Sequence, residues 1–363
     1  MRELLVISGK GGTGKTSIVG SFAVLADSKV LADCDVDAAD LHLLLSPTVR
    51  ATHEFRASRQ ALLDPAKCVG PHQCRASAIC AEVCRFGAID LSDLSDLSGL
   101  SGLSGLPGRA GSRDGFGDGA SFGARPGDGS SAGTSAGSEA GSAARAGLPN
   151  IIPRIDPISC EGCGVCARAC PHGAISMEEV LSGHWFVSDT ACGPMVHARL
   201  GVAQENSGKL VAQVRREARS IAESRSLDYI ITDGPPGIGY PVISSMSGVD
   251  LTLIVTEPTV AGAHDMHRAV ELARHFGVKT TVCINKYDLD EAGSEQLEEY
   301  CSSQGIQVAG KVPFDEEVVA ALVRGVPVVA RGSSHHVEGK AAQAIRRLWA
   351  NIEGELAGRQ TGA

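Results

Sequence analysis

Apolar residues recur along this chain in short runs that alternate with longer stretches of helical spacing. The first run, residues 3–8, leads into a glycine-rich segment and then into an apolar-periodic stretch from Ser17 to Ala26. That order predicts a strand, a loop and a helix. A second strand is predicted just before Asp33, and further buried strands are predicted at 228–232, 251–256 and 279–284. Buried strands with helical patterns between them are typical of a doubly wound, mostly parallel α/β sheet.

A block of different composition interrupts this pattern. From residue 91 to residue 150, 36 of 60 residues are Gly, Ser or Ala, and such a segment buries too little apolar surface to offset its ordering entropy. We therefore predict a disordered linker at 91–150. It lies within an insert at 61–182, so the sheet domain is expected to comprise residues 1–60 and 183–363.

Charge and hydropathy exclude several classes of partner. The chain has 42 acidic and 33 basic residues and a net charge of −9, which offers no electrostatic footprint for nucleic acid. No segment approaches the ~20 apolar residues that span a bilayer, and the amino terminus lacks a signal-peptide core. We expect a cytoplasmic protein, and in that reducing compartment clustered cysteines indicate cofactor ligands rather than disulfides.

The glycine-rich segment has the spacing of a phosphate-binding loop. Residues 9–16 read Gly-Lys-Gly-Gly-Thr-Gly-Lys-Thr, in which Lys15 would offset the charge of the β- and γ-phosphates and the Thr16 hydroxyl would bind Mg²⁺. The alternative is a glycine-rich turn with an incidental lysine. The predicted nucleotide-binding residues are Gly9, Gly11, Gly12, Thr13, Gly14, Lys15, Thr16 and Ser17.

Two cysteine runs form the second chemical feature. Residues 160–171 have the spacing C-x2-C-x2-C-x3-C-P, which is typical of ferredoxins that bind 4Fe-4S clusters. Zinc is the alternative, but zinc sites favour widely separated C-x2-C pairs. An earlier run has longer first spacers, although the residues before and after both runs align as an internal repeat. Its cysteines are Cys68, Cys74, Cys80 and Cys84.

The resemblance to two-cluster bacterial ferredoxins implies that the two runs exchange their fourth cysteines. The first cluster would be held by Cys68, Cys74, Cys80 and Cys170, and the second by Cys84, Cys160, Cys163 and Cys166. A frame counted back from Cys84 would instead make Cys74 the first ligand and Ser77 the second. That frame leaves Cys68 spare and the first cluster weakly held or with three irons.

Lys10 makes the phosphate loop resemble a particular group, the MinD, ParA and nitrogenase iron-protein superfamily of ATPases. The resemblance implies that Lys10 acts catalytically across a dimer interface on the partner's nucleotide, as an arginine finger does. It also implies that Asp35 positions the attacking water, with Asp33 and Asp37 as other candidates, and that Asp233 holds Mg²⁺. A helix cap is the alternative role for the first aspartate.

Asn285 ends the predicted 279–284 strand and resembles the base-recognition residue of the same superfamily, although an Asn-Lys pair is also common in turns. His197 and Lys209 lie in further stretches that resemble the superfamily, with no assigned role. Four cysteines stand alone and are expected to be buried apolar residues: Cys34, Cys192, Cys283 and Cys301.

The whole pattern resembles superfamily ATPases that carry an inserted ferredoxin domain. We expect a dimer, either with itself or with a related ATPase, in which ATP, Mg²⁺ and two 4Fe-4S clusters couple nucleotide state to electron transfer with an unidentified redox protein. A cluster carrier is the first alternative. A MinD- or ParA-type spatial organiser is the second, and its membrane helix would be residues 341–352, whose apolar positions fit packing on the sheet equally well.

Overall fold

The computed structural model describes residues 1–74, 78–91, 152–201, 207–330 and 339–358. They form two compact units, Met1–Arg59 with Glu179–Ala363, and Gln60–Glu178. The sequence placed the boundaries at 60/61 and 182/183, close to these positions. The predicted linker at 91–150 lies, except for Leu91, outside the described residues.

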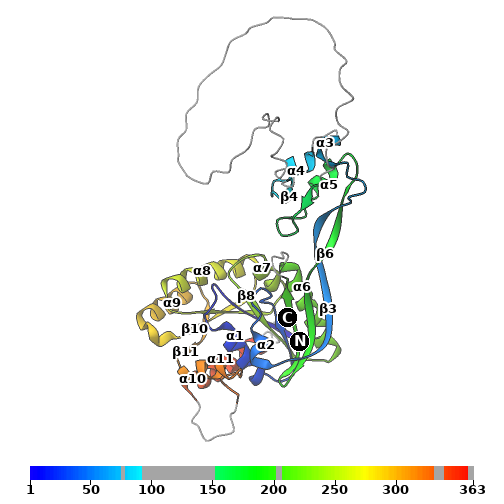
Figure 1. The fold of residues 1–363 in the computed structure, drawn as a ribbon. Coiled ribbons are helices and arrows are strands. Elements are labelled where there is room, and N and C mark those ends of the chain that lie inside the picture. Colours follow the sequence, from blue (N-terminus) through cyan, green and yellow to red (C-terminus); the bar gives the residue numbers. More distant parts are fainter. Residues whose placement is uncertain (75–77, 92–151, 202–206, 331–338, 359–363) are drawn as a thin grey trace, which may run out of the picture. The chain divides into compact units, whose positions relative to one another are not determined.

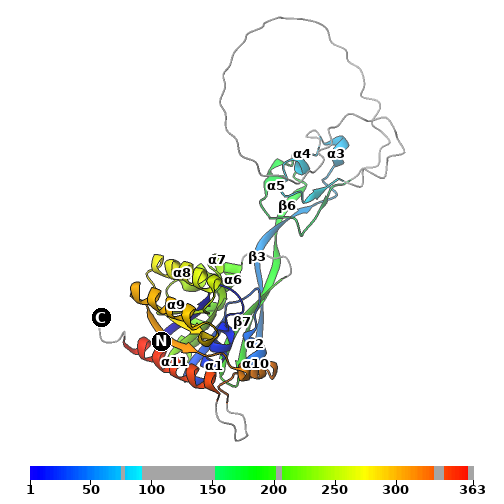
Figure 2. The same ribbon diagram turned by 90° about the vertical axis from the view of Figure 1, so that its left-hand side faces the viewer.

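The first unit, called here the sheet unit, contains most of a nine-stranded sheet in the order β11-β10-β9-β1-β8-β2-β7-β6-β3 (Figures 1 and 2). Neighbouring strands from β11 to β7 run parallel, and β6 pairs antiparallel with β7. The mostly parallel α/β sheet predicted from the sequence is thus confirmed. Its strands are β1 (Arg2–Ser8), β2 (Lys29–Asp33), β3 (Thr48–Leu63), β6 (Ile175–Thr190), β7 (Gly193–Leu200), β8 (Tyr229–Pro236), β9 (Leu251–Thr256), β10 (Thr280–Asn285) and β11 (Gln307–Val312).

Helices cover both faces of this sheet because its central strands are apolar on both sides. Leu4 and Val6 of β1 pack under α1, α2 and α11, whereas Leu5 and Ile7 pack under α7, α8 and α9. Helix α6 covers β2 and β7. The helices of the unit are α1 (Lys15–Leu25), α2 (Leu41–Leu45), α6 (Ser207–Ser224), α7 (Tyr240–Met246), α8 (Val260–His275), the 3₁₀ turn η2 (Tyr287–Leu289), α9 (Glu291–Ser303), α10 (Glu316–Val323) and α11 (Lys340–Ala357).

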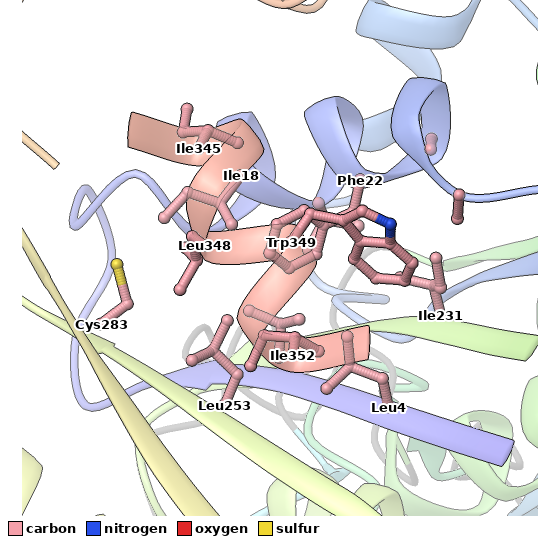
Figure 3. Packing of buried hydrophobic residues seen from close by; sticks show 14 of the residues in the cluster. Leu4, Ile18, Phe22, Ile231, Leu253, Cys283, Ile345, Leu348, Trp349 and Ile352 are labelled. Atoms are coloured by element: carbon pink, nitrogen blue, oxygen red, sulfur yellow. The ribbon is translucent and has the colours of Figure 1, made fainter. Parts of the chain in front are cut away.

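Helix α11 contains the residues that a membrane helix would have used. Its apolar side chains Ile345, Leu348, Trp349 and Ile352 are at most 5% exposed. Trp349 packs on Phe22 of α1 with ring centroids 5.0 Å apart (Figure 3). Packing on the sheet therefore accounts for this apolar face. None of the helices in the described part of the chain is long and apolar enough to cross a membrane.

The second unit, called here the cysteine unit, is small and built from two similar halves. Its short strands β4 (Ile89–Asp90) and β5 (Arg154–Ile155) pair antiparallel. Its helices are α3 (Gly70–Gln73), α4 (Ile79–Glu82) and α5 (Val165–Ala169). Strand β3 ends in this unit and β6 begins in it, so these two long strands carry the chain into and out of it.

Candidate nucleotide and cysteine sites

The phosphate loop joins the buried strand β1 to helix α1, which begins at Lys15. Gly14 caps the helix with φ 89°, and a Cβ there would lie 2.4 Å from the Asn285 side chain. Only glycine fits both the left-handed backbone and this close approach. The helix therefore presents its free N–H groups and the positive end of its dipole to the loop, an arrangement that favours phosphate.

Lys15 faces carboxylates rather than solvent. Its Nζ lies 2.5 Å from Asp233 Oδ1 and 3.5 Å from Asp35 Oδ2. Burial alone would lower the pKa of Lys15, but the carboxylates of Asp233 and Asp35 outweigh burial and raise it. The lysine is therefore fixed as a cation at the point where the loop would receive the β- and γ-phosphates.

Carboxylates outnumber the lysine at this site. Burial, followed by the charge of Asp233, raises the pKa of Asp33 well above its usual value, and burial also raises the pKa of Asp35. Asp33 Oδ2 and Asp233 Oδ2 are buried without a hydrogen-bond partner among the described residues. Such oxygens suit a divalent cation or its water shell, so the donor set fits Mg²⁺. Asp37, the third candidate for positioning the attacking water, is exposed.

Asn285 and Lys10 both make contacts within the chain. The Asn285 Nδ2 donates to the Thr13 carbonyl at 2.7 Å, so this side chain is tied to the phosphate loop. Lys10 Nζ lies 2.7 Å from Glu257 Oε1 on its own chain. The other oxygen of Glu257 lies 3.1 Å from Lys286 Nζ, which also contacts the Gly12 carbonyl at 3.4 Å.

His197 lies in the sheet beside this site. On β7 it is the register neighbour of Asp33 on β2. Its Nε2 lies 2.9 Å from Ser188 Oγ and its ring stacks on Phe186. Burial, with the neighbouring His42 and Arg199, lowers the pKa of His197 to about 4, so the ring is neutral at physiological pH. Lys209, in contrast, is an exposed residue at the start of α6.

The eight clustered cysteines gather in two groups of four. One pocket is lined by Cys68, Cys74, Cys80 and Cys170. Burial raises the pKa of Cys80, and the thiols of Cys170, Cys68 and Cys74 raise it further. In the same way burial raises the pKa of Cys166, with added contributions from the thiols of Cys160, Cys163 and Cys84. Cys170 therefore neighbours the first run and Cys84 neighbours the second; that these thiols ligate clusters stays a prediction.

Two backbone hydrogen bonds bring the cysteine runs together. The Asp64 N–H, before the first run, donates to the Ala174 carbonyl after the second run at 2.7 Å. The equivalent Asp156 N–H, before the second run, donates to the Ala88 carbonyl after the first at 2.8 Å. Each run therefore ends beside the start of the other. Helix α3 lies between Cys68 and Cys74 and accounts for part of the longer first spacer.

The chemistry of the two groups fits iron–sulfur clusters, which are held by thiolates. Backbone N–H groups of Ala61 and Ala174 point to the sulfurs of Cys160 and Cys170 at 3.5 and 3.3 Å. No three His, Cys, Asp or Glu side chains in the described ranges converge closely enough to hold a single metal ion. A cubane needs no such convergence, because each thiolate binds its own iron. Ser77, the ligand in the alternative frame, lies outside the described residues.

The isolated cysteines belong to the sheet unit. Cys34, Cys283 and Cys301 are fully buried, as predicted, and Cys192 is half-buried. Burial raises the pKa of Cys283 to about 12 and that of Cys301 to about 11, so both remain protonated thiols.

Sequence reasoning overlooked Glu257, the residue that pairs with two lysines of the site. It directly follows β9, and the carboxyl ends of parallel strands are where such sheets bind ligands. Its place at the end of a buried strand is the signal that could have identified it.

Comparison with known proteins finds a matching family and several relatives. Residues 4–328 match the family described as the CobQ/CobB/MinD/ParA nucleotide binding domain. An uncharacterized protein of Methanocaldococcus jannaschii is 24% identical over 356 residues, which cover 97% of this chain and 96% of that protein. An iron-sulfur cluster carrier protein of Pyrococcus abyssi is 28% identical over 142 residues, or 35% of this chain and 47% of the carrier.

A solved structure shows the same fold. The septum site-determining protein MinD from Pyrococcus horikoshii, complexed with Mg-ADP, superposes with a TM-score of 0.50 at 13% identity over 100% of this chain and 99% of that one. With the family match covering most of the sequence and a phosphate loop in place, this chain belongs to the CobQ/CobB/MinD/ParA family of nucleotide-binding domains.

Proposed function

We propose that the chain is an ATP-hydrolysing iron–sulfur protein in which nucleotide state controls electron transfer through two 4Fe-4S clusters. The observation that carries the proposal is the gathering of eight cysteines into two groups of four, in a chain that also has a phosphate loop. A bound cluster supplies one-electron chemistry. The cysteine thiolates would hold it, and the N–H groups directed at Cys160 and Cys170 would stabilise the charge on those sulfurs.

In the sheet unit, the residues of the nucleotide site would take separate roles in the hydrolysis of ATP. Lys15 would pair with the β- and γ-phosphates, while Thr16 and Asp233 would hold Mg²⁺. Asp35, which lies 3.5 Å from Lys15, would orient the attacking water. Lys10 would act on the nucleotide of a second subunit, so that hydrolysis depends on a dimer. The buried oxygens of Asp33 and Asp233 support the Mg²⁺ assignment.

Iron and sulfide quantitation under anaerobic conditions, with electron paramagnetic resonance and potentiometry, tests this function. We expect about eight irons per chain and cluster potentials that change when Mg-ATP is added. If Mg-ATP changes neither the potentials nor the rate of electron transfer to an artificial acceptor, coupling is contradicted. A chain that binds zinc and no iron would contradict the clusters themselves.

A cluster carrier is the second candidate, and the match to the Pyrococcus abyssi carrier favours it. Carriers of the Mrp type bridge a labile cluster with a C-x2-C pair from each subunit. Here the cysteines late in the sheet unit, Cys283 and Cys301, are single and fully buried. Incubation of the loaded protein with an apo-ferredoxin separates the two candidates, because a carrier loses iron to the acceptor and an electron-transfer protein retains it.

A further inference from the structure

Glu257 joins two cations beside the phosphate loop. Its Oε1 pairs with Lys10 and its Oε2 with Lys286, at 2.7 and 3.1 Å. Strands β1, β9 and β10 are neighbours in the sheet, so the residues that follow them meet at one edge. Partial burial favours the neutral acid, but hydrogen bonds from Lys10 and Lys286 outweigh it and lower the pKa of Glu257.

The main chain of Glu257 is held in place by its neighbours. The Thr259 N–H donates to the Glu257 carbonyl at 2.8 Å. A Cβ on Gly262, in the first turn of α8, would lie 2.4 Å from the same carbonyl oxygen, so the helix start packs tightly against it. The two lysines are instead about one-third exposed, and their long side chains can change partner. Glu257 is thus the fixed member of the trio and the lysines are its movable members.

We propose that Glu257 is a positioning residue that holds Lys10 and Lys286 against their own subunit in the nucleotide-free chain and gives up Lys10 when a nucleoside triphosphate binds at the loop. The proposal rests on the proposed function in requiring a triphosphate at this loop. Phosphate oxygens would compete with Glu257 for both ammonium groups, those on the same loop for Lys286 and those on the loop of a second subunit for Lys10. Binding of a triphosphate therefore includes the work of separating Lys10 from Glu257.

Amine labelling tests the contact directly, without any need for nucleotide. The full chain, with and without Glu257→Gln, is treated briefly with an acetylating reagent, and modification of each lysine is measured by peptide mass spectrometry. We expect Lys10 to react about five-fold faster in the variant, the size of effect typical of a partly exposed ion pair. Glu257→Asp, which keeps the charge on a shorter side chain, should restore part of the protection.

A matched control comes from the same unit. Glu298 pairs with Lys311 at 2.6 Å on the surface, so Glu298→Gln should speed the labelling of Lys311 and leave Lys10 unchanged. Equal labelling of Lys10 in the wild type and in Glu257→Gln would overturn the proposal.

Equilibrium dialysis with Mg-ATP and Mg-ADP supplies the second readout. Glu257→Gln should tighten ATP binding about five-fold and ADP binding less, whereas mere structural damage would weaken both. The gain should disappear in a Lys10→Ala background, because no ion pair then remains to be broken. A gain that persists there comes from the general field of the carboxylate and contradicts the proposal. If the wild type binds no nucleotide, the proposed function fails, and the labelling result still decides the role of Glu257.

Discussion

At the scale of single residues, the nucleotide site is organised by an imbalance of charge. One buried lysine, Lys15, faces the carboxylates of Asp33, Asp35 and Asp233, and burial raises the pKa of the first two. A buried group of carboxylates with too few cations is costly unless protons or metal ions neutralise it. Mg²⁺ and the nucleotide would therefore bind here together, because Mg²⁺ would neutralise both the carboxylates and the phosphates.

This balance predicts the effect of Asp233→Asn. The variant removes the carboxylate nearest Lys15, so Mg²⁺ should no longer strengthen ATP binding, and the affinity for Mg-ATP should fall by about 100-fold. Isothermal titration with ATP, first with Mg²⁺ present and then with a chelator, measures the affinity for ATP with and without the ion. Asp37→Asn is the matched control because Asp37 is exposed and should have little effect. An unchanged Mg²⁺ dependence in Asp233→Asn would show that another group holds the ion.

His197 predicts a pH dependence of stability. Its folded pKa of about 4 lies below the ordinary value of 6.5, so the unfolded state binds the proton more readily. Stability should therefore fall as the pH drops from about 6.5 towards 4, by about 1 kcal/mol at pH 5 after allowance for solvent at the half-buried ring. Denaturant unfolding at pH 7 and pH 5 measures the loss. His197→Asn should show a smaller loss, and an identical pH dependence would exclude this residue as its source.

At the same scale, the sequence identified the residues of the phosphate loop but not all of their contacts. Residue type and spacing predict Lys15 as a phosphate ligand because the loop is a local structure. The contact of Asn285 with the Thr13 carbonyl and the pairing of Glu257 with Lys10 join residues more than 240 positions apart. Such contacts depend on which strands become neighbours in the sheet, which local pattern does not specify.

At the scale of elements, apolar runs located the buried strands well. Strands β8, β9 and β10 begin or end within a few residues of the predicted ranges, because fully buried parallel strands are continuously apolar. Strands β3 and β6 were missed. Most of the sixteen residues of β3 are exposed or half-buried, so its sequence lacks the apolar run that marked the others.

Helix α11 allows a test of how much its packing contributes to stability. Trp349 is 5% exposed and contacts Phe22 and Tyr229, so Trp349→Ala should lower the free energy of unfolding of the sheet unit by about 3–5 kcal/mol. Chemical denaturation followed by circular dichroism measures it. Arg347→Ala, on the exposed side of the same helix, should change stability by less than about 0.5 kcal/mol. Equal effects of the two variants would contradict the burial of this face.

At the scale of the whole molecule, two sequence-distant cysteine runs act as one unit. The reciprocal bonds of Asp64 with Ala174 and of Asp156 with Ala88 bring each run to the other. The repeat was visible in the sequence because both ends of each run align. The sequence leaves two possible ligand frames for the first run. Cys68 lines the same pocket as Cys74, Cys80 and Cys170, while Ser77 of the other frame lies outside the described residues.

Exchange of the fourth cysteine predicts a crossed effect of mutation. Cys170 belongs to the second run, but Cys170→Ser should remove the first cluster. Cys84 belongs to the first run, but Cys84→Ser should remove the second cluster. Each variant should retain about four of about eight irons, and the two should keep different paramagnetic resonance signals. If Cys170→Ser and Cys160→Ser instead leave the same signal, the ligand sets are not exchanged.

The two long strands have a consequence for how such a protein arises. The Ser182 hydroxyl of β6 accepts hydrogen bonds from the N–H groups of Ala57 and Ser58 of β3. The chain leaves the sheet unit after Arg59 and re-enters it at Glu179, so these two points are neighbours. A short turn could join those points without altering the strand order. A single insertion or deletion in the gene could therefore add or remove the cysteine unit. A gene without this unit would still encode the strands of the nucleotide-binding sheet.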